Sequence, residues 1–394
     1  MLGRVESDRS GVRNSAPNRL LTLVCALVLG GILIAGLWPF HAASNDVSWL
    51  SLQTSLFFGK HGSIISAGTF EASPLQADSP GSLEISLEPS RVDSGGTVLA
   101  FYRPTNRTVP FVLRQFVDGL LIQRKGQEPK SQTTSVYVDD VFSRLQPMLL
   151  TVSSGEQGTA IYVDGMLVKK ARDFKFSSRD MNGQLIVGNA PSARNNWCGK
   201  LKGLTFYDRE LPAAEVAQHF ADWTKAKRPN LVKSEGVVAS YLFNEGKGNV
   251  VHNQVDSATD LVIPERYFVL DQQLLVRPWK EFHSRWSYWV DVGINIAGFI
   301  PFGFCFRALF AKIEKVKRAT AITIALGFVV SLTIEVLQAF LPTRDSGMTD
   351  LITNTFGTAM GAMLCTWILK SNSFERTGIF SVLPLNEEEE YLVP

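Results

Sequence analysis

Four long apolar runs and one region of alternating residues divide the chain. The first run, 20–40, carries no charge, and three more follow at about 288–310, 319–341 and 349–369. Each is long enough to cross a bilayer, because about 20 apolar residues span a hydrocarbon core about 30 Å thick. The pattern predicts an all-α bundle of four transmembrane helices with a separate domain between the first and second.

The region between the first two runs has the pattern of β-strands. Leu83, Ile85 and Leu87 alternate with polar residues, which is typical of a half-buried strand. Many such short strands predict an all-β antiparallel sandwich or jelly roll over 48–263, with one helix at 212–222. The predicted strands are 81–88, 97–102, 111–115, 119–124, 148–153, 159–163, 183–187 and 199–207.

Basic residues predict the orientation, because short cytoplasmic segments are enriched in Lys and Arg. They cluster before the first run and between the second and third, at Arg4, Arg9, Arg13, Arg19, Lys312, Lys315, Lys317 and Arg318. Both termini are then cytoplasmic and residues about 41–287 extracytoplasmic. The remaining segments are predicted as a disordered tail at 1–19, an interfacial connector without chemistry at 264–287, and an acidic tail at 370–394.

The first run has a second interpretation as a signal peptide. Ala42, Ala43 and Ser44 follow it, and small residues are typical of cleavage sites. However, the run is longer than the usual apolar core of a signal peptide, and it ends near Trp38, a residue type that anchors helices at the membrane interface. We therefore expect an uncleaved membrane helix.

Composition narrows the classes of function. A formal net charge of +2 gives no sign of a nucleic-acid partner. Cys198 is the one cysteine in the β-rich region, and the five histidines are scattered, so we expect no metal and no cofactor. The candidates for calcium are loop aspartates, a residue type that more often forms turns. They are Asp118, Asp139, Asp140 and Asp164.

Three motifs in the β-rich region carry a family resemblance, at 160–168, 185–188 and 197–211. In the first, Asp164-Gly165 between apolar strands predicts a tight hairpin turn. In this order the motifs resemble the laminin G-like, concanavalin A-like jelly roll, whose members bind glycans or proteins and in a few cases hydrolyse glucans. Glu84 and Glu88 share a predicted strand but lack the carboxylate spacing of such hydrolases, so the resemblance implies binding.

Polar residues accompany the last three apolar runs. Three pairs at helical spacing each share one helix face: Asp291 with Asn295, Glu335 with Gln338, and Asp350 with Asn354. Arg344 lies in the loop before the last run. Because ionisable residues in or beside membrane helices are costly unless partnered, this cluster is a candidate functional site. The predicted orientation places it at the extracytoplasmic ends of the helices.

Small residues predict where the helices approach closely. They are Gly357 and Gly361 on the last run, which continue the face of Asn354, and Gly293, Gly298 and Gly303 on the second. Pro301 removes a backbone hydrogen bond and predicts a kink or a re-entrant break in the second run.

The polar residues and their surroundings resemble the VanZ-like family. The family pattern reads N-x-x-x-F-x-P-F-G, E-x-x-Q, R-x-x-x-x-x-D and N-x-x-G, and it is present within 291–304, 335–338 and 344–357. The resemblance covers about 288–369. It implies a bacterial inner-membrane protein with a cell-envelope role and brings no established catalytic mechanism. The jelly roll is then an insertion between two helices of one bundle.

Three interpretations of the polar cluster stay open. They are a structural network, a cleft for a polar or anionic envelope group with Arg344 as anion contact, and catalysis with Glu335 or Asp350 as general base. The sequence leaves enzymatic activity undecided, and we favour a non-enzymatic membrane protein whose jelly roll binds glycan or protein. The alternative is a membrane enzyme or transporter acting on a lipid-linked cell-wall or polysaccharide precursor. Expected partners are the membrane and a glycan, an envelope lipid or another envelope protein.

Overall fold

The chain forms two compact units, Ala42–Gln272 and Met1–His41 with Gln273–Pro394. The computed structural model describes residues 15–41, 43–50, 55–71, 79–92, 95–126, 132–192, 195–225, 236–282, 284, 286–312 and 316–378. Most of the predicted N-terminal tail, the end of the acidic tail, and the basic residues Arg4, Arg9, Arg13 and Lys315 lie outside this range.

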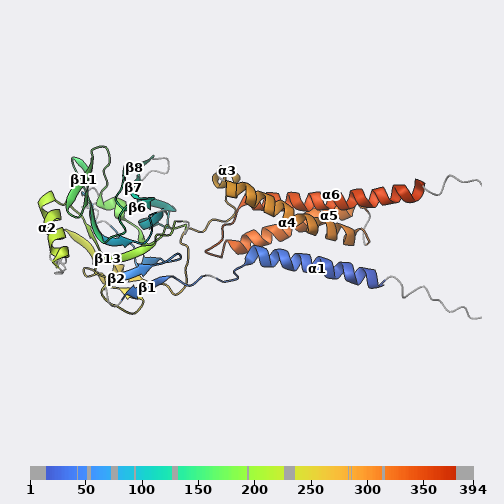
Figure 1. Cartoon of the computed structure of the whole chain (residues 1–394), viewed down its shortest axis with the longest axis horizontal. Coiled ribbons are helices and arrows are strands. Elements are labelled where there is room, and N and C mark those ends of the chain that lie inside the picture. The colour runs from blue at the N-terminus through green and yellow to red at the C-terminus, as the bar shows by residue number, and fades with distance from the viewer. Residues whose placement is uncertain are drawn as a thin grey trace, which may run out of the picture. The chain divides into compact units, whose positions relative to one another are not determined.

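The unit Ala42–Gln272 is a sandwich of two antiparallel sheets (Figure 1). The first sheet has the order β1 (Val47–Leu50), β2 (Ser55–Phe58), β13 (Gly199–Tyr207), β4 (Ser82–Pro89), β9 (Met148–Gly155), β10 (Gly158–Val163) and β11 (Met166–Ala171), with β14 (Val237–Tyr241) also paired to β13. The second has the order β15 (Val250–Val251), β16 (Leu261–Val262), β3 (Ile64–Ser66), β12 (Gln184–Val187), β5 (Gly96–Arg103), β6 (Thr108–Phe116), β7 (Gly119–Lys125) and β8 (Thr133–Val138). All the predicted strands are present, and the predicted fold class is confirmed.

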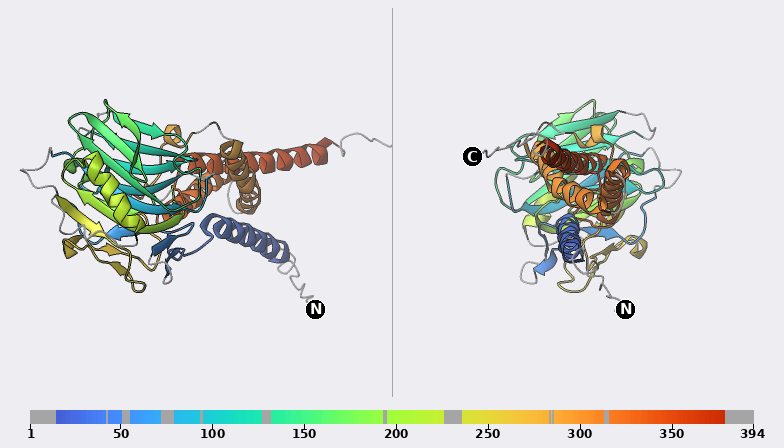
Figure 2. Two further views of the ribbon diagram at one scale, coloured as in Figure 1. Left: turned by 60° about the vertical axis from the view of Figure 1, so that its left-hand side comes forward. Right: turned by 90° about the vertical axis from the view of Figure 1, so that its right-hand side faces the viewer.

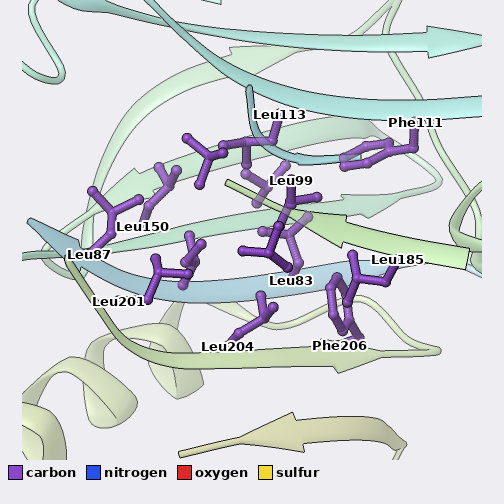
Figure 3. Packing of buried hydrophobic residues seen from close by; sticks show 14 of the residues in the cluster. Leu83, Leu87, Leu99, Phe111, Leu113, Leu150, Leu185, Leu201, Leu204 and Phe206 are labelled. Carbon is purple, nitrogen blue, oxygen red and sulfur yellow. The ribbon is translucent and has the colours of Figure 1, made fainter. Parts of the chain in front are cut away.

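The core lies between the sheets, where alternate residues of both meet (Figure 3). Leu83 and Leu87 of β4 are fully buried there, together with Leu99 of β5 and Leu113 of β6. Alternation along a strand places every second side chain on one face, so the predicted pattern at Leu83 and Leu87 identifies the inner face of β4 correctly. Ile85 points into the same core, whereas Glu84 lies on the opposite face of the strand, where it contacts His219 of α2.

The turn between β10 and β11 has the predicted conformation. Asp164 has a φ of 52° and Gly165 a φ of 75°, so both central residues adopt the left-handed region that a type I′ turn requires. The Asp164 carboxylate also accepts the N–H of Leu149 at 2.9 Å, which fits a turn-forming role for this aspartate.

Helix α2 (Ala213–Thr224) covers the outward face of the first sheet (Figure 2). Its Val216 packs with Tyr162 and Tyr207 of the sheet in a second small apolar cluster. Gly203 of β13 lies directly beneath the indole of Trp223, so a Cβ at Gly203 would overlap that ring. The predicted helix at 212–222 is therefore confirmed, and it closes one of the two outer surfaces of the sandwich.

The second unit is helical, with α1 (Ser15–Leu37), α3 (Pro278–Glu281), α4 (Trp286–Phe310), α5 (Val316–Gln338) and α6 (Met348–Gly378). Among the described residues, Arg19–Leu37, Trp286–Phe310 and Arg318–Gln338 are long and apolar enough to cross a membrane. Helix α6 covers the fourth predicted span but is less apolar. It also continues to Gly378, so the beginning of the predicted acidic tail is helical.

Helices α4 and α6 pack backbone against backbone. A Cβ at Gly357 or Gly361 would overlap the carbonyl oxygen of Ile296 or Ile300, respectively, and Gly303 meets the backbone of Thr358 in the same way. Such close approach is the usual role of small residues in membrane helices.

Two predictions about α4 are wrong in part. Gly293 and Gly298 have no atom of another element within reach of an added Cβ, so neither lies at a close crossing. The re-entrant break at Pro301 is also absent, because α4 runs through it. Proline holds φ near the helical value, and the buried neighbours Phe299 and Phe302 hold the helix on both sides of it.

Replacing Gly357 by Ala should destabilise the helical unit, because the methyl group would force α4 and α6 apart. Overpacking of this kind costs about 1–3 kcal/mol. We expect a lower thermal midpoint for Gly357→Ala in detergent. Gly298→Ala is the matched control, and it should leave the midpoint unchanged or raise it, since Ala is the better helix former. Equal effects of the two substitutions would contradict the close crossing.

Candidate functional site

One end of the helical unit gathers most of the predicted polar cluster. Helices α1 and α5 finish there, and α4 and α6 begin there. The seven predicted residues come from three helices and one loop: Asp291 and Asn295 of α4, Glu335 and Gln338 of α5, Arg344, and Asp350 and Asn354 of α6. Their contacts show what each one does.

The N-terminus of α6 is held by two carboxylates from other helices. Glu335 of α5 accepts the N–H of Gly347 at 2.7 Å, and Glu281 of α3 accepts the N–H of Thr349 at 3.1 Å together with its hydroxyl. The N–H of Met348 donates to the carbonyl of Val276 at 2.9 Å. The first N–H groups of a helix have no partner within it, and here neighbouring segments supply that partner.

The C-terminus of α1 is held by two donors in a corresponding way. The Gln338 amide donates to the carbonyl oxygen of Gly36 at 2.8 Å, and Nε of Arg344 donates to that of Trp38 at 3.1 Å. A positive charge beside the last carbonyls of a helix is favourable, because the helix dipole makes that end negative. Arg344 therefore stabilises the end of α1 in this structure.

Two further contacts join side chains of neighbouring helices. The Asn295 amide donates to the Asp350 carboxylate at 2.8 Å, which joins α4 to α6. The Asn354 amide donates to the hydroxyl of Ser331 at 3.0 Å, which joins α6 to α5. Asp291 is exposed on α4, as is Asp345 in the loop.

The arrangement is chemically suited to holding helix ends together. Carboxylates outnumber cations at this end, and the one arginine of the cluster already binds a helix carbonyl. An anion would therefore meet mostly negative groups here. The geometry favours the structural interpretation over an anion-binding cleft.

Sequence reasoning missed two polar residues of the helical unit. Glu281 lies in the predicted connector, and its carboxylate accepts the Thr349 N–H at the start of α6. Arg307 is completely buried on α4, and its Nε donates to the hydroxyls of Thr320 and Thr366 at 2.9 and 3.1 Å. An arginine at the end of an apolar run is usually interpreted as a residue at the membrane interface. The threonines on the neighbouring runs could have indicated that this arginine has buried hydrogen-bond partners.

In the sandwich, the glutamates considered for hydrolysis belong to separate networks. Buried Glu84 accepts hydrogen bonds from Thr151 at 3.0 Å and from Tyr207 at 2.8 Å, and its carboxylate lies 2.8 Å from Nδ1 of His219 on α2. Glu88 instead pairs with Lys200 at 2.7 Å. Glu84 thus ties α2 to the sheet, and the two carboxylates do not form a catalytic pair.

This network shifts two pKa values. Burial, followed by the Glu84 charge, raises the pKa of Tyr207, which keeps its hydroxyl protonated. Burial opposes protonation of His219, but the hydrogen bond to Glu84 and the charges of Glu84 and Glu215 outweigh it and raise the pKa of the imidazole.

Within the described residues, the outward face of the second sheet is covered over part of its width. Phe268 and Leu270 lie with Ile65 and Ile186 around a small pocket over β3 and β12, and Arg107 holds this covering segment through Asp271 at 2.8 Å. The strands β6, β7 and β8 lie beyond it.

The part-exposed side chains on β6–β8 form two rows across the strands. Leu113, Ile122 and Val136 point into the core, so their strand neighbours point outward. By strand register, one row is Arg114, Leu121 and Tyr137, and the other is Val112, Gln123 and Ser135. The rows combine a guanidinium, a phenol ring, an amide and a hydroxyl on one surface.

Comparison with known families identifies part of the chain. The VanZ/LLP1 family model matches residues 237–370. The predicted VanZ-like region is therefore confirmed, and the match starts further upstream than the predicted residue 288, among the last strands of the sandwich. The chain thus combines a region that matches the VanZ/LLP1 model, helices apolar enough to cross a membrane, and a β-sandwich unit.

Solved structures similar to this chain are remote in sequence. One is a sialidase CBM40 from Ruminococcus gnavus bound to α2,3-sialyllactose, with 13% identity, coverage of 36% of this chain and 84% of that chain, and a TM-score of 0.31. Another is a putative carbohydrate-binding protein from Bacteroides ovatus, with 12% identity, coverage of 59% and 63%, and a TM-score of 0.37. A third is a SAP-like pentraxin from Limulus polyphemus, with 12% identity, coverage of 40% and 75%, and a TM-score of 0.32. No curated protein matches the chain.

The role of Glu335 at the start of α6 can be tested by two substitutions. Glu335→Ala leaves the Gly347 N–H without a partner, a loss of about 1–3 kcal/mol. We expect this variant to have a clearly lower thermal midpoint. Glu335→Gln keeps an acceptor oxygen and should retain most of the stability. Asp291→Asn is the control on the exposed side of α4 and should behave as wild type. A Glu335→Gln variant as unstable as Glu335→Ala would argue against the cap.

The contact between His219 and Glu84 should make the stability of the sandwich depend on pH. Because the folded-state pKa of His219 is raised, its contribution is fully present below the unfolded pKa of about 6.5 and is lost as pH rises through the folded value. Thermal midpoints measured from pH 6 to pH 9 should therefore fall with rising pH. This slope should be smaller in His219→Gln, and an identical slope would exclude His219 as its source.

Proposed function

We propose that this protein is a non-enzymatic receptor of the bacterial cell envelope. Its helices anchor it in the inner membrane, and its jelly roll binds glycan on the extracytoplasmic side. Both termini are then cytoplasmic and the sandwich outside, the orientation that the basic residues beside the first helix and between the second and third favour. The VanZ/LLP1 match and the apolar helices support the membrane location.

The observation that carries glycan binding is the unequal covering of the two sheets. Helix α2 and the Glu84 network occupy the outward face of the first sheet. The face of β6–β8 instead keeps Tyr137, Gln123 and Arg114 part-exposed in adjacent rows. Aromatic rings with an apolar face and a polar tip, next to a few fixed polar groups, suit a ligand that is itself amphipathic and hydroxylated.

The capping contacts argue against the alternative of a membrane enzyme or transporter. A general base must reach a substrate proton, but Glu335 is buried and accepts the Gly347 N–H. Asp350 likewise holds the Asn295 amide. Both carboxylates therefore have structural partners, which supports a role in holding the bundle together.

Glycan binding can be measured with the full-length protein in detergent on an array of cell-wall and exopolysaccharide glycans. We expect specific retention that weakens at least about tenfold in Tyr137→Ala, since loss of about 1.4 kcal/mol at one aromatic contact corresponds to that factor. Gln218→Ala replaces an exposed residue of α2 and is the control, which should bind as wild type. Absence of retention on every glycan would refute glycan binding, and an unaffected Tyr137→Ala would refute this face as its site.

A further inference from the structure

Three buried polar atoms without hydrogen-bond partners belong to neighbouring backbone positions at one edge of the β6–β8 face. They are the hydroxyl of Thr97, Nε of Arg114 and the amide nitrogen of Asn196, all of them buried atoms. Thr97 lies opposite Arg114 in the ladder between β5 and β6, and Asn196 forms a β-bridge with Thr97. The Thr97 side chain is almost completely buried, with an exposed fraction of 1%.

Neighbouring contacts fix the two donors in place. Nη2 of Arg114 donates to the side-chain oxygen of Asn195 at 2.9 Å. The oxygen of Asn196 accepts the hydroxyl of Tyr267 at 3.1 Å, so its amide nitrogen is the end that has no partner. Buried polar groups are rarely left unpaired, and each such group calls for an explanation. Of these residues, Arg114 belongs to the row that continues with Leu121 and Tyr137.

Resting on the proposed glycan function, we propose that this spot binds the anionic substituent of an acidic glycan. Arg114, whose side chain is part-exposed, is the anion contact, and Thr97 and Asn196 lie at the neighbouring backbone positions. The adjoining row of Leu121 and Tyr137 carries the rest of the sugar. Carboxylate, sulfate and phosphate groups all present oxygens that match a guanidinium, which donates several N–H groups in one plane.

The charge of Arg114 favours an anion over a neutral sugar. Within the residues that the structure describes, Arg114 hydrogen-bonds to an amide and has no carboxylate partner. Burial lowers the pKa of its guanidinium, but an arginine keeps its charge in proteins. A part-buried charge without a counter-ion is unfavourable, and a bound anion would compensate it.

The test uses the full-length protein in detergent and an array that pairs each acidic glycan with its counterpart lacking the anionic group. Glycans with carboxylate, sulfate and phosphate groups are tested separately, so the group that gives the strongest binding identifies the preferred anion. We expect at least tenfold stronger binding to acidic members than to their neutral counterparts. Arg114→Gln should abolish this preference, while Arg172→Gln, an exposed arginine with the same change in charge, should keep it.

The outcomes separate this inference from the proposed function. Equal binding of acidic and neutral counterparts by the wild-type protein would overturn the inference while leaving glycan binding intact. Loss of the preference in both variants would overturn the assignment to Arg114. Absence of binding to any glycan would overturn both proposals. The wild-type comparison needs no substitution, so it decides the matter even if Arg114→Gln fails to fold.

Discussion

A helix that crosses a membrane must find partners for the backbone groups at its ends, and in this molecule other segments provide them. Glu335 and Glu281 accept N–H groups at the start of α6, and Gln338 and Arg344 donate to carbonyls at the end of α1. These contacts join α1 and α3 to α5, to α6 and to the loop between α5 and α6. Glu335, Gln338 and Arg344 therefore bind backbone groups at helix ends.

In the sandwich, the outward faces of the two sheets are covered differently. The first sheet receives α2, whose apolar stripe and His219 meet a matching surface that includes buried Glu84. Within the described residues, the second sheet is covered by a short segment around Phe268, and β6–β8 carry mixed aromatic and polar side chains. The first face thus serves stability, and the second is the face that we propose for recognition.

The periodicity of apolar residues predicted the strands and helices well, because it depends on which side of each element faces apolar surroundings. The strands of the sandwich, the turn at Asp164 and the crossing at Gly357 all followed from local pattern. Contacts between distant segments could not be predicted from local pattern. Nothing in the sequence around Glu281 indicates that its carboxylate binds the start of α6. Helical spacing likewise could not show that Gly298 has no neighbour from another helix. The rows on β6–β8 required the register of three strands, which one sequence does not contain.

The partners at the end of α1 have a consequence for the order in which the protein is made. Gln338 lies 302 residues after Gly36, and Arg344 lies 306 residues after Trp38. During synthesis, the first helix therefore exists without these donors until the sandwich and two more helices have been translated. Its end must rely on water and lipid headgroups in the meantime. Attachment of the end of the first helix to α5 and to the loop after it is thus a late step of synthesis.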